Sequence, residues 1–453
     1  MNTLLVRMTA ALLTTAFYSL AGASSLPESA GYRGEIRRDA DGKLVAVPTA
    51  PRTETGTQAS TTAPPIAPQR KSEKLAGQTA TQTARITDTG GPAKTIRVGP
   101  QQAVRSISVA ATMARDGDTI EIEAGDYIAD VASWKQNRLT IRGVGPTRPR
   151  LIANGANAEG KAIWVVKGGQ ITVDNIEFRG ARVPDKNGAG IRFEKGHLIV
   201  RNSKFEDNEN GILSGSGADM QLDIENSEFG HNGAGDGRSH NIYIGHIGKL
   251  TVSGSYFHHA RTGHLLKSRA SESHIFYNRL TDEIGGKASY ELDFSNGGIA
   301  YVVGNLIEQS SQTENSNIIS FGPEGYQKGS NELYLINNTI ADNRPHNGNI
   351  LLLKSGASKV VLMNNLLVTR SKFSPKLEEN GGNNINVDWD QFVLPQRYDF
   401  RLLANSKLIG KYLTPLPANG VGLIPQREYV HPTGSRPLSS PGRMPGAFQT
   451  TGP

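Results

Sequence analysis

A short pattern of hydrophobic and polar residues recurs through the middle of the chain. In each copy, apolar and polar residues alternate, a small polar turn follows, and an apolar residue closes the unit, as in "ITVDNIEF", "LIVRNSKF", "LDIENSEF", "LTVSGSYF", "HIFYNRL", "YVVGNLI", "LYLINNTI" and "VVLMNNLL". The closing residues recur every 23 to 33 positions, at Phe178, Phe205, Phe229, Phe257, Leu280, Ile307, Ile340 and Leu367. A unit of this length cannot bury its own apolar face, so neighbouring units must stack into a solenoid.

The residues within each unit predict strands rather than helices. Apolar residues return with a period of two, and no helical period of useful length is present. Asn and Gly separate the strands, and Asn suits such corners because it tolerates a left-handed backbone and its amide can bond the equivalent Asn one coil away. The predicted fold is all-β, a parallel β-helix.

The first edge of such a solenoid needs a cover, because exposed strand edges invite aggregation. Residues 101–115, "QQAVRSISVAATMAR", carry apolar residues at helical spacing and predict a short amphipathic capping helix. The entry "DGDTIEIEAGDY" follows directly. With this entry, residues 96–412 resemble the right-handed parallel β-helix superfamily typified by pectate lyases, and the resemblance implies that fold.

The two ends of the chain differ from this repeat region. Residues 1–23 contain one Arg, an apolar run and an Ala-Gly-Ala stop, a pattern typical of a secretory signal peptide, so we expect an exported protein, periplasmic or extracellular. Residues 24–95 are rich in Pro, Thr and Ala and are predicted to form a disordered linker. Residues 413–453 predict an extended Pro/Gly-rich tail that packs back along the domain. No later segment approaches the ~20 apolar residues of a membrane-spanning helix.

Composition narrows the chemistry and the partners. The 453 residues contain no Cys, which excludes disulfides, zinc thiolate sites and cysteine nucleophiles. The formal net charge is +7, but residues 1–95 hold 11 Lys/Arg against 7 Asp/Glu and residues 413–453 hold 3 Arg against 1 Glu, which leaves about +1 for residues 96–412. The domain therefore lacks the charge expected of a nucleic-acid-binding protein. We expect a monomer that acts on a polysaccharide.

Ionisable residues gather on the strands that open the central coils. These strands are "NIYIG" (241–245), "HLLKS" (264–268), "YELDF" (290–294) and "NIISF" (317–321). If the alternate apolar residues point inward, then Tyr243, Lys267, Glu291 and Asp293 point outward. Stacked strands lie ~4.8 Å apart, so Lys267 would lie beside Asp293 and close to Tyr243.

This cluster suits removal of a proton next to a uronate carboxyl group, with loss of the 4-linked sugar. Such β-elimination needs a base, a proton donor for the leaving oxygen and a cation that neutralises the carboxylate. Lys267 is the first candidate for the base, because cationic neighbours would lower its pKa, and His240 and His264 come next. The candidate catalytic residues are Lys267, Tyr243, His240, His264, Arg269 and Asp293, and the candidate substrate-binding residues are Glu291, His246, Glu324 and Asn241.

A second resemblance supports this chemistry. The segment "LLKSRASESHIFYN" is similar to the β-helical alginate and chondroitin lyases, in which a Lys-Ser step precedes an Asn-rich turn and the Lys serves as base. The resemblance implies that Lys267 is the base. In these lyases an Arg on the next coil serves as the catalytic acid, and at the equivalent position this chain has Asp293. These lyases also have a Ca²⁺ site, but this sequence shows no clear Asn/Glu/Glu set for it, only the close pair Glu291 and Asp293, so we expect no cofactor. Together "SHNIYIGH", "GHLLKSRA", "SYELDFSNGG" and "GNLIEQ" are also similar to a group of exported bacterial β-helix proteins.

Three alternatives to a lyase remain open. Lys267 and Asp293 could form a surface ion pair that contributes ~0–1 kcal/mol. The scaffold could be that of a glycoside hydrolase that uses Glu291 or Asp293 with Glu324. It could also be that of a non-catalytic glycan-binding or envelope protein.

The two His residues after Phe257, His258 and His259, are interpreted as a solvated corner. His246 and His264 lack an evident third ligand, so we identify no metal site.

Overall fold

The computed structural model describes residues 92–346, 348–368, 373 and 381–452, together with the strands at 34–38 and 44–48. The chain divides into two units, Met1–Arg85 and Ile86–Pro453. In the first unit, β1 (Gly34–Arg38) pairs antiparallel with β2 (Leu44–Pro48). Both strands lie within residues 24–95, which the sequence predicts to be a disordered linker. The signal-peptide prediction for residues 1–23 lies outside the described residues.

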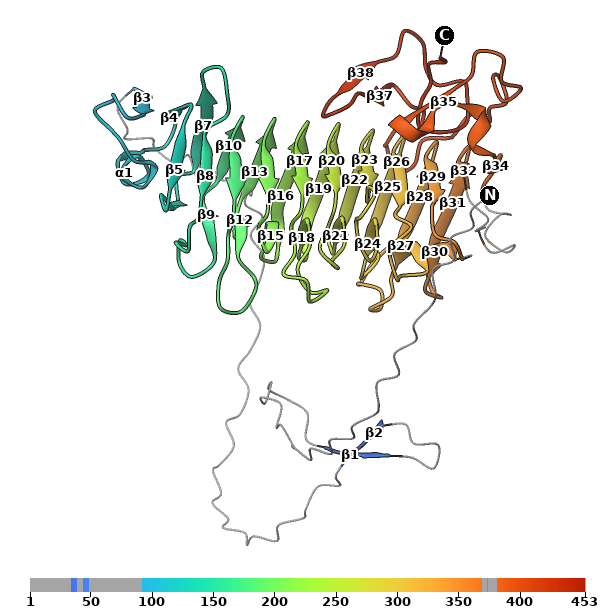
Figure 1. Cartoon of the computed structure of the whole chain (residues 1–453), viewed down its shortest axis with the longest axis horizontal. Coiled ribbons are helices and arrows are strands. Elements are labelled where there is room, and N and C mark those ends of the chain that lie inside the picture. The colour runs from blue at the N-terminus through green and yellow to red at the C-terminus, as the bar shows by residue number, and fades with distance from the viewer. Residues whose placement is uncertain are drawn as a thin grey trace, which may run out of the picture. The chain divides into compact units, whose positions relative to one another are not determined.

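Three long parallel sheets build the second unit (Figure 1). Sheet I has 12 strands: β3 (Thr95–Val98), β4 (Thr119–Glu123), β7 (Arg138–Val144), β10 (Gln170–Asp174), β13 (His197–Arg201), β16 (Gly217–Glu225), β19 (Ile247–Ser253), β22 (Glu272–Phe276), β25 (Ile299–Val303), β28 (Glu332–Ile336), β31 (Lys359–Met363) and β33 (Gly381–Gly382). Sheet II has 11 strands: β5 (Asp126–Ile128), β8 (Arg150–Ile152), β11 (Glu177–Arg179), β14 (Lys204–Glu206), β17 (Glu228–Gly230), β20 (Tyr256–His258), β23 (Arg279–Thr281), β26 (Leu306–Gln309), β29 (Thr339–Asp342), β32 (Leu366–Val368) and β34 (Ile385–Asn386). Sheet III has 9 strands: β6 (Ala132–Trp134), β9 (Ala162–Val166), β12 (Ala189–Phe193), β15 (Asn210–Ser214), β18 (Ile242–Ile244), β21 (Leu266–Ser268), β24 (Leu292–Phe294), β27 (Asn317–Phe321) and β30 (Asn349–Leu353).

Each complete coil visits sheets I, II and III in turn, and its strands pair in parallel with the equivalent strands of the adjacent coils. This is the right-handed parallel β-helix that the repeat and the first resemblance predict. The described part of the chain contains no helix that is both long and apolar enough to cross a membrane.

Side chains of one kind stack from coil to coil inside the helix. The rings of Phe178, Phe205, Phe229 and Phe257 stack in sheet II with centroids 4.7–4.9 Å apart. All the residues that close the repeat are buried, which confirms their predicted place in the core. At the corner between sheets I and II, the side-chain amides form a hydrogen-bonded ladder that contains Asn278, Asn305, Asn338, Asn365 and Asn384.

A short helix, α1 (Ile107–Met113), covers the first coil. The Ser106 hydroxyl accepts from the amide of Val109, and the Asp130 carboxylate accepts from the amides of Ile107 and Ser108. Ile107 and Ala110 are buried against the core. The helix is shorter than the predicted stretch 101–115, because these caps fix its first turn at Ile107.

The C-terminal segment lies alongside the last coils (Figure 1). It contains η1 (Trp389–Gln391), β35 (Phe392–Leu394), η2 (Pro395–Arg397), β36 (Asp399–Leu402), β37 (Arg427–Tyr429) and β38 (Ser435–Pro437). Backbone groups of this segment bond to the side chains of the corner residues: Asn337 Nδ2 donates to the Met444 carbonyl, and Asn364 Nδ2 donates to that of Leu413. These contacts attach the segment to the solenoid.

Candidate functional site

The central strands of sheet III place polar side chains on the outer face of the solenoid. Tyr243, Lys267, Asp293 and Ser320 are register partners on β18, β21, β24 and β27. Their neighbours in each strand are buried in the core or at its edge. The alternation of the strand therefore sends these four side chains outward. The predicted register is confirmed.

Lys267 and Arg269 share one carboxylate group. Glu324 lies in the turn after β27, with Oε1 3.0 Å from Lys267 Nζ and Oε2 2.6 Å from Arg269 Nη2. Lys267 Nζ also lies 3.3 Å from Asp293 Oδ2. The Glu324 side chain is 45% exposed, whereas that of Lys267 is 10% exposed. The carboxylate that bridges the two cations is thus the outermost part of the network.

The two cations determine the ionisation of Glu324. Partial burial alone would raise the pKa of this carboxyl group, but the hydrogen bonds from Lys267 and Arg269 outweigh burial and the pKa is lowered. Glu324 is therefore anionic at neutral pH. The pair formed by Lys267 and Arg269 binds a carboxylate in this structure.

Tyr243 lies next to this carboxylate-binding pair. Its hydroxyl oxygen accepts a hydrogen bond from Arg269 Nε at 3.2 Å, and Lys267 Nζ lies 5.5 Å from the centroid of its ring. Because the oxygen accepts from Arg269, the hydroxyl proton can be donated elsewhere. Its position suits a group that moves a proton beside a bound carboxylate.

His264 lies on the inner side of the same network. Burial lowers its pKa to about 4, although the charge of Asp293 opposes this shift, so the imidazole is neutral at pH 7. The Tyr290 amide donates to Nδ1 at 3.3 Å, which assigns the proton to Nε2, 3.5 Å from Asp293 Oδ2. We name Tyr243, His264, Lys267, Arg269, Asp293 and Glu324 the sheet III cluster.

Four predicted site residues lie outside this cluster: His240, Asn241, His246 and Glu291. His240 is buried behind His264, and its Nδ1 accepts from the His264 amide at 2.9 Å. Burial lowers the pKa of His240 well below its usual value, and the nearby His264 adds to this effect. Asn241 is buried in a corner ladder, where its Oδ1 accepts from Asn232 Nδ2 at 2.9 Å and its Nδ2 donates to the His258 carbonyl.

Glu291 and His246 also lie outside the cluster, and neither is part of a strand. Glu291 is fully buried, since β24 begins at Leu292 and strand alternation does not extend into the preceding turn. Burial raises its pKa well above the usual value, and Gln309 Nε2 donates to it at 3.4 Å. His246 is exposed in the turn between β18 and β19. The prediction of substrate contact by Glu291 is therefore wrong.

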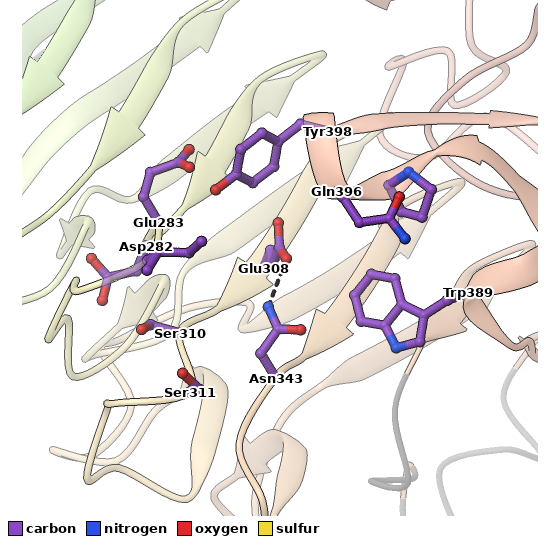
Figure 2. A pocket seen from close by; sticks show the side chains of 11 residues that line it. Asp282, Glu283, Glu308, Ser310, Ser311, Asn343, Trp389, Gln396 and Tyr398 are labelled. Carbon is purple, nitrogen blue, oxygen red and sulfur yellow. Dashed lines mark hydrogen bonds between the residues drawn. The ribbon is translucent and has the colours of Figure 1, made fainter.

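A second candidate site lies between sheet II and the C-terminal segment, and the sequence reasoning missed it. Figure 2 shows Asp282, Glu283, Glu308, Trp389 and Tyr398 around it, with the Tyr398 ring near Glu283 and Trp389 at the right. The cavity has a volume of about 450 Å³. Its other lining residues are Ile284, Ser310, Ser311, Asn343, Pro395 and Gln396. We name it the C-terminal pocket.

Two buried carboxyl groups give the C-terminal pocket its chemistry. Asn343 Nδ2 donates to Glu308 Oε1 at 2.6 Å, while Glu308 Oε2 is buried without a hydrogen-bond partner. Burial raises the pKa of Glu308 to about 7 and that of Asp282 to about 7. Each group can therefore donate or accept a proton near neutral pH. Trp389, which is 38% exposed, offers an aromatic face at the rim.

The raised pKa of Glu308 predicts a pH dependence of stability. A carboxyl group whose pKa is higher in the folded than in the unfolded state stabilises the folded protein. This contribution is complete below the unfolded-state pKa and is lost as the pH rises through the folded-state pKa. From a usual pKa of 4.5 to about 7, the loss between pH 5 and pH 8 is up to ~3 kcal/mol. In Glu308→Gln, the free energy of unfolding should therefore fall less over this range. Denaturant titrations of both proteins at pH 5 and 8 check this, and equal slopes with pH would refute it.

Comparisons with known proteins support the fold. No family model matches the chain, and no curated protein matches it. Five chains of solved structures match, among them the crystal structure of pectate lyase Pel9A. That match has 15% sequence identity and a TM-score of 0.50, and covers 73% of this chain and 96% of the other. At this identity, the likeness shows a shared right-handed β-helix fold.

Proposed function

We propose that the protein binds an acidic polysaccharide along the outer face of sheet III and cleaves it by β-elimination. The observation that carries the proposal is the Glu324 carboxylate, which lies 3.0 Å from Lys267 Nζ and 2.6 Å from Arg269 Nη2. A uronate sugar presents the same group. The similarity in fold to a pectate lyase agrees with a long sugar chain as the ligand. The sequence of residues 1–23 supports export as part of the proposal.

In the binding step, the carboxylate of a uronate residue takes the place of Glu324. Glu324 is the most exposed member of the ion-paired network, and it lies in a turn rather than in a strand. Lys267 and Arg269 then neutralise the substrate carboxylate. Neutralisation stabilises the negative charge that develops when the adjacent carbon loses its proton.

In the chemical step, a base takes the proton from C5 of the uronate. The C5–H electron pair forms the C4–C5 double bond, the C4–O4 bond breaks, and O4 leaves with a proton. We assign the proton transfers to Tyr243, because its hydroxyl lies beside the carboxylate-binding pair and accepts a hydrogen bond from Arg269 Nε. Lys267, predicted from the sequence as the base, instead contacts two carboxylates, those of Asp293 and Glu324. It fits the carboxylate-binding role better.

A panel of polymers tests the reaction class. The purified chain is incubated with alginate, glycosaminoglycans, pectins and bacterial exopolysaccharides, and two products are followed: unsaturated uronate by its ultraviolet absorbance, and reducing ends. The proposal expects both signals to rise together on at least one acidic polymer. Reducing ends without absorbance would indicate hydrolysis and would contradict β-elimination. Binding without either product would favour a glycan-binding protein.

Glu324→Gln should strengthen binding of acidic oligosaccharides. The substitution keeps the size of the side chain but removes the charge that competes for Lys267 and Arg269. We expect a three- to tenfold lower Kd for a uronate oligosaccharide, corresponding to ~0.7–1.4 kcal/mol. Calorimetric titration measures it. Glu332→Gln, at a half-buried position of sheet I, is the matched control and should not change the Kd. Weaker binding in Glu324→Gln would mean that Glu324 itself contacts the sugar.

A second candidate function is sugar hydrolysis in the C-terminal pocket. The observation that favours it is the pair Asp282 and Glu308, both with a pKa of about 7, in a cavity that also holds Trp389. Carboxyl groups of this kind serve as acid and base in glycoside hydrolysis. Glu308→Gln should then abolish the release of reducing ends, while Tyr243→Phe should leave it unchanged. The opposite pattern would assign the reaction to the sheet III cluster.

A further inference from the structure

Three His residues meet at a corner of the solenoid that neither candidate site includes. His231 follows β17, His258 ends β20 and His259 comes next. One ring nitrogen from each of them lies within 4.8 Å of the others. His258 is buried, which corrects the interpretation of a solvated corner, whereas His231 and His259 are half-buried. A small ligand could therefore reach the group from solvent.

One ring nitrogen of each His lies close to those of the other two, and His258 Nε2 also contacts Glu228 Oε1. His258 Nδ1 lies 2.8 Å from His259 Nδ1. The His231 ring stacks on the His259 ring with centroids 4.6 Å apart. His231 Nδ1 is buried without a hydrogen-bond partner; Glu206 Oε1, at 3.4 Å, meets the distance for an ion pair but makes no hydrogen bond. Nδ1 of His231, an atom that can bind a metal ion, is thus left without a hydrogen bond inside the group.

The repeat geometry creates this arrangement. His231 and His259 stand at equivalent positions of successive coils, each two residues after a core Phe, and both have a left-handed backbone with φ of 55° and 45°. Gly230 pairs with His258 across the sheet. A Cβ atom at Gly230 would lie 2.2 Å from His258 Cε1, so Gly230 leaves room for this ring.

The groups around the three imidazoles include carboxylates. Glu228 Oε1 lies 3.3 Å from His258 Nε2. Carboxylates at this distance orient metal-binding imidazoles in proteins. Lys204 also faces the site, but Glu206 and Glu228 balance its charge at 2.5 and 3.2 Å.

We propose that His231, His258 and His259 bind a divalent transition-metal ion of the Zn²⁺ class, with water as the remaining ligand. Three imidazole nitrogens suit Zn²⁺, Ni²⁺ or Cu²⁺, whereas Ca²⁺ and Mg²⁺ prefer oxygen ligands. Zn–N bonds of ~2.0–2.1 Å require nitrogens roughly 3.3 Å apart. The ring nitrogens lie within 4.8 Å of one another, with His258 Nδ1 and His259 Nδ1 at 2.8 Å, so the rings must shift on binding. The site is separate from the proposed lyase reaction.

Calorimetry on the untagged full chain, stripped with chelator, tests the proposal. Titration with ZnCl₂ should show one site with a Kd of micromolar or below, and CaCl₂ should give no binding. His231→Gln and His259→Gln, both at half-buried positions, should each weaken Zn²⁺ binding at least tenfold. His246→Gln, at an exposed His outside the group, is the matched control and should leave it unchanged.

The melting temperature separates loss of the site from loss of the fold. The metal-free His231→Gln protein should melt within a few degrees of the metal-free wild type, and only the wild type should gain stability when Zn²⁺ is added. Absence of one-site binding, or equal Zn²⁺ affinity in wild type and both variants, would overturn the proposal. Gly230→Ala gives an independent check, because it displaces the His258 ring without removing a ligand, and should also weaken binding.

Discussion

Tyr243→Phe is expected to lower kcat for cleavage of the best acidic polymer by 100- to 10,000-fold with little change in KM. The hydroxyl is the proposed proton-transfer group, and general acid–base catalysis contributes a rate factor of about that size. The ring, which Lys267 and Arg269 approach to 5.5 and 5.6 Å, remains in the variant. The binding surface is therefore kept, and the initial rate of unsaturated uronate formation measures the loss.

Tyr334→Phe is the matched control for this variant. Tyr334 lies on sheet I and donates its hydroxyl proton to Glu332, away from the sheet III cluster. It should cleave at the wild-type rate. A Tyr243→Phe protein with an unchanged kcat would remove Tyr243 from the mechanism, and Lys267 would again be the candidate base.

Phe229→Ala is expected to lower the free energy of unfolding by about 3–5 kcal/mol. Phe229 is fully buried, and its ring stacks on Phe205 and Phe257 with centroids 4.7 and 4.8 Å away. The substitution leaves a cavity between two coils. The coils cannot close it, because the paired strands on both sides fix the distance between coils. Denaturant unfolding followed by circular dichroism measures the change.

Ile284→Ala is the control for loss of apolar side-chain atoms, because Ile284 is 91% exposed and should change stability by less than about 0.5 kcal/mol. If Phe229→Ala lost no more than this control, the stacked rings would contribute little to the stability of the solenoid. Because coils contact only their neighbours, unfolding can proceed in steps, so both the midpoint and the slope are compared.

The repeat explains why much of the fold could be predicted from the sequence. Period-two alternation determines which side chains of a strand point outward, and the coil length aligns Tyr243, Lys267 and Asp293. The same rule failed at Glu291, because it was applied to a turn residue. It also failed at Asn241, where side-chain hydrogen bonds to Asn232 and to the His258 carbonyl of the next coil hold a polar residue inside.

The C-terminal pocket and the group of three His residues could not be predicted from the repeat pattern alone. The C-terminal pocket joins Glu308 to Trp389, which lies in an irregular segment after the last coils, and no periodicity predicts where that segment returns. The His group had a usable signal, since His231 and His259 each follow a repeat-closing Phe by two residues. Comparison of equivalent positions in successive coils would have brought these two residues together.

The most direct test of the central claim is a crystal structure of Tyr243→Phe with an acidic oligosaccharide of the polymer that the wild type cleaves. The account predicts a sugar carboxylate within hydrogen-bond distance of Lys267 Nζ and Arg269 Nη2, with Glu324 displaced from both. An oligosaccharide bound elsewhere, with the Glu324 bridge between Lys267 and Arg269 intact, would contradict it.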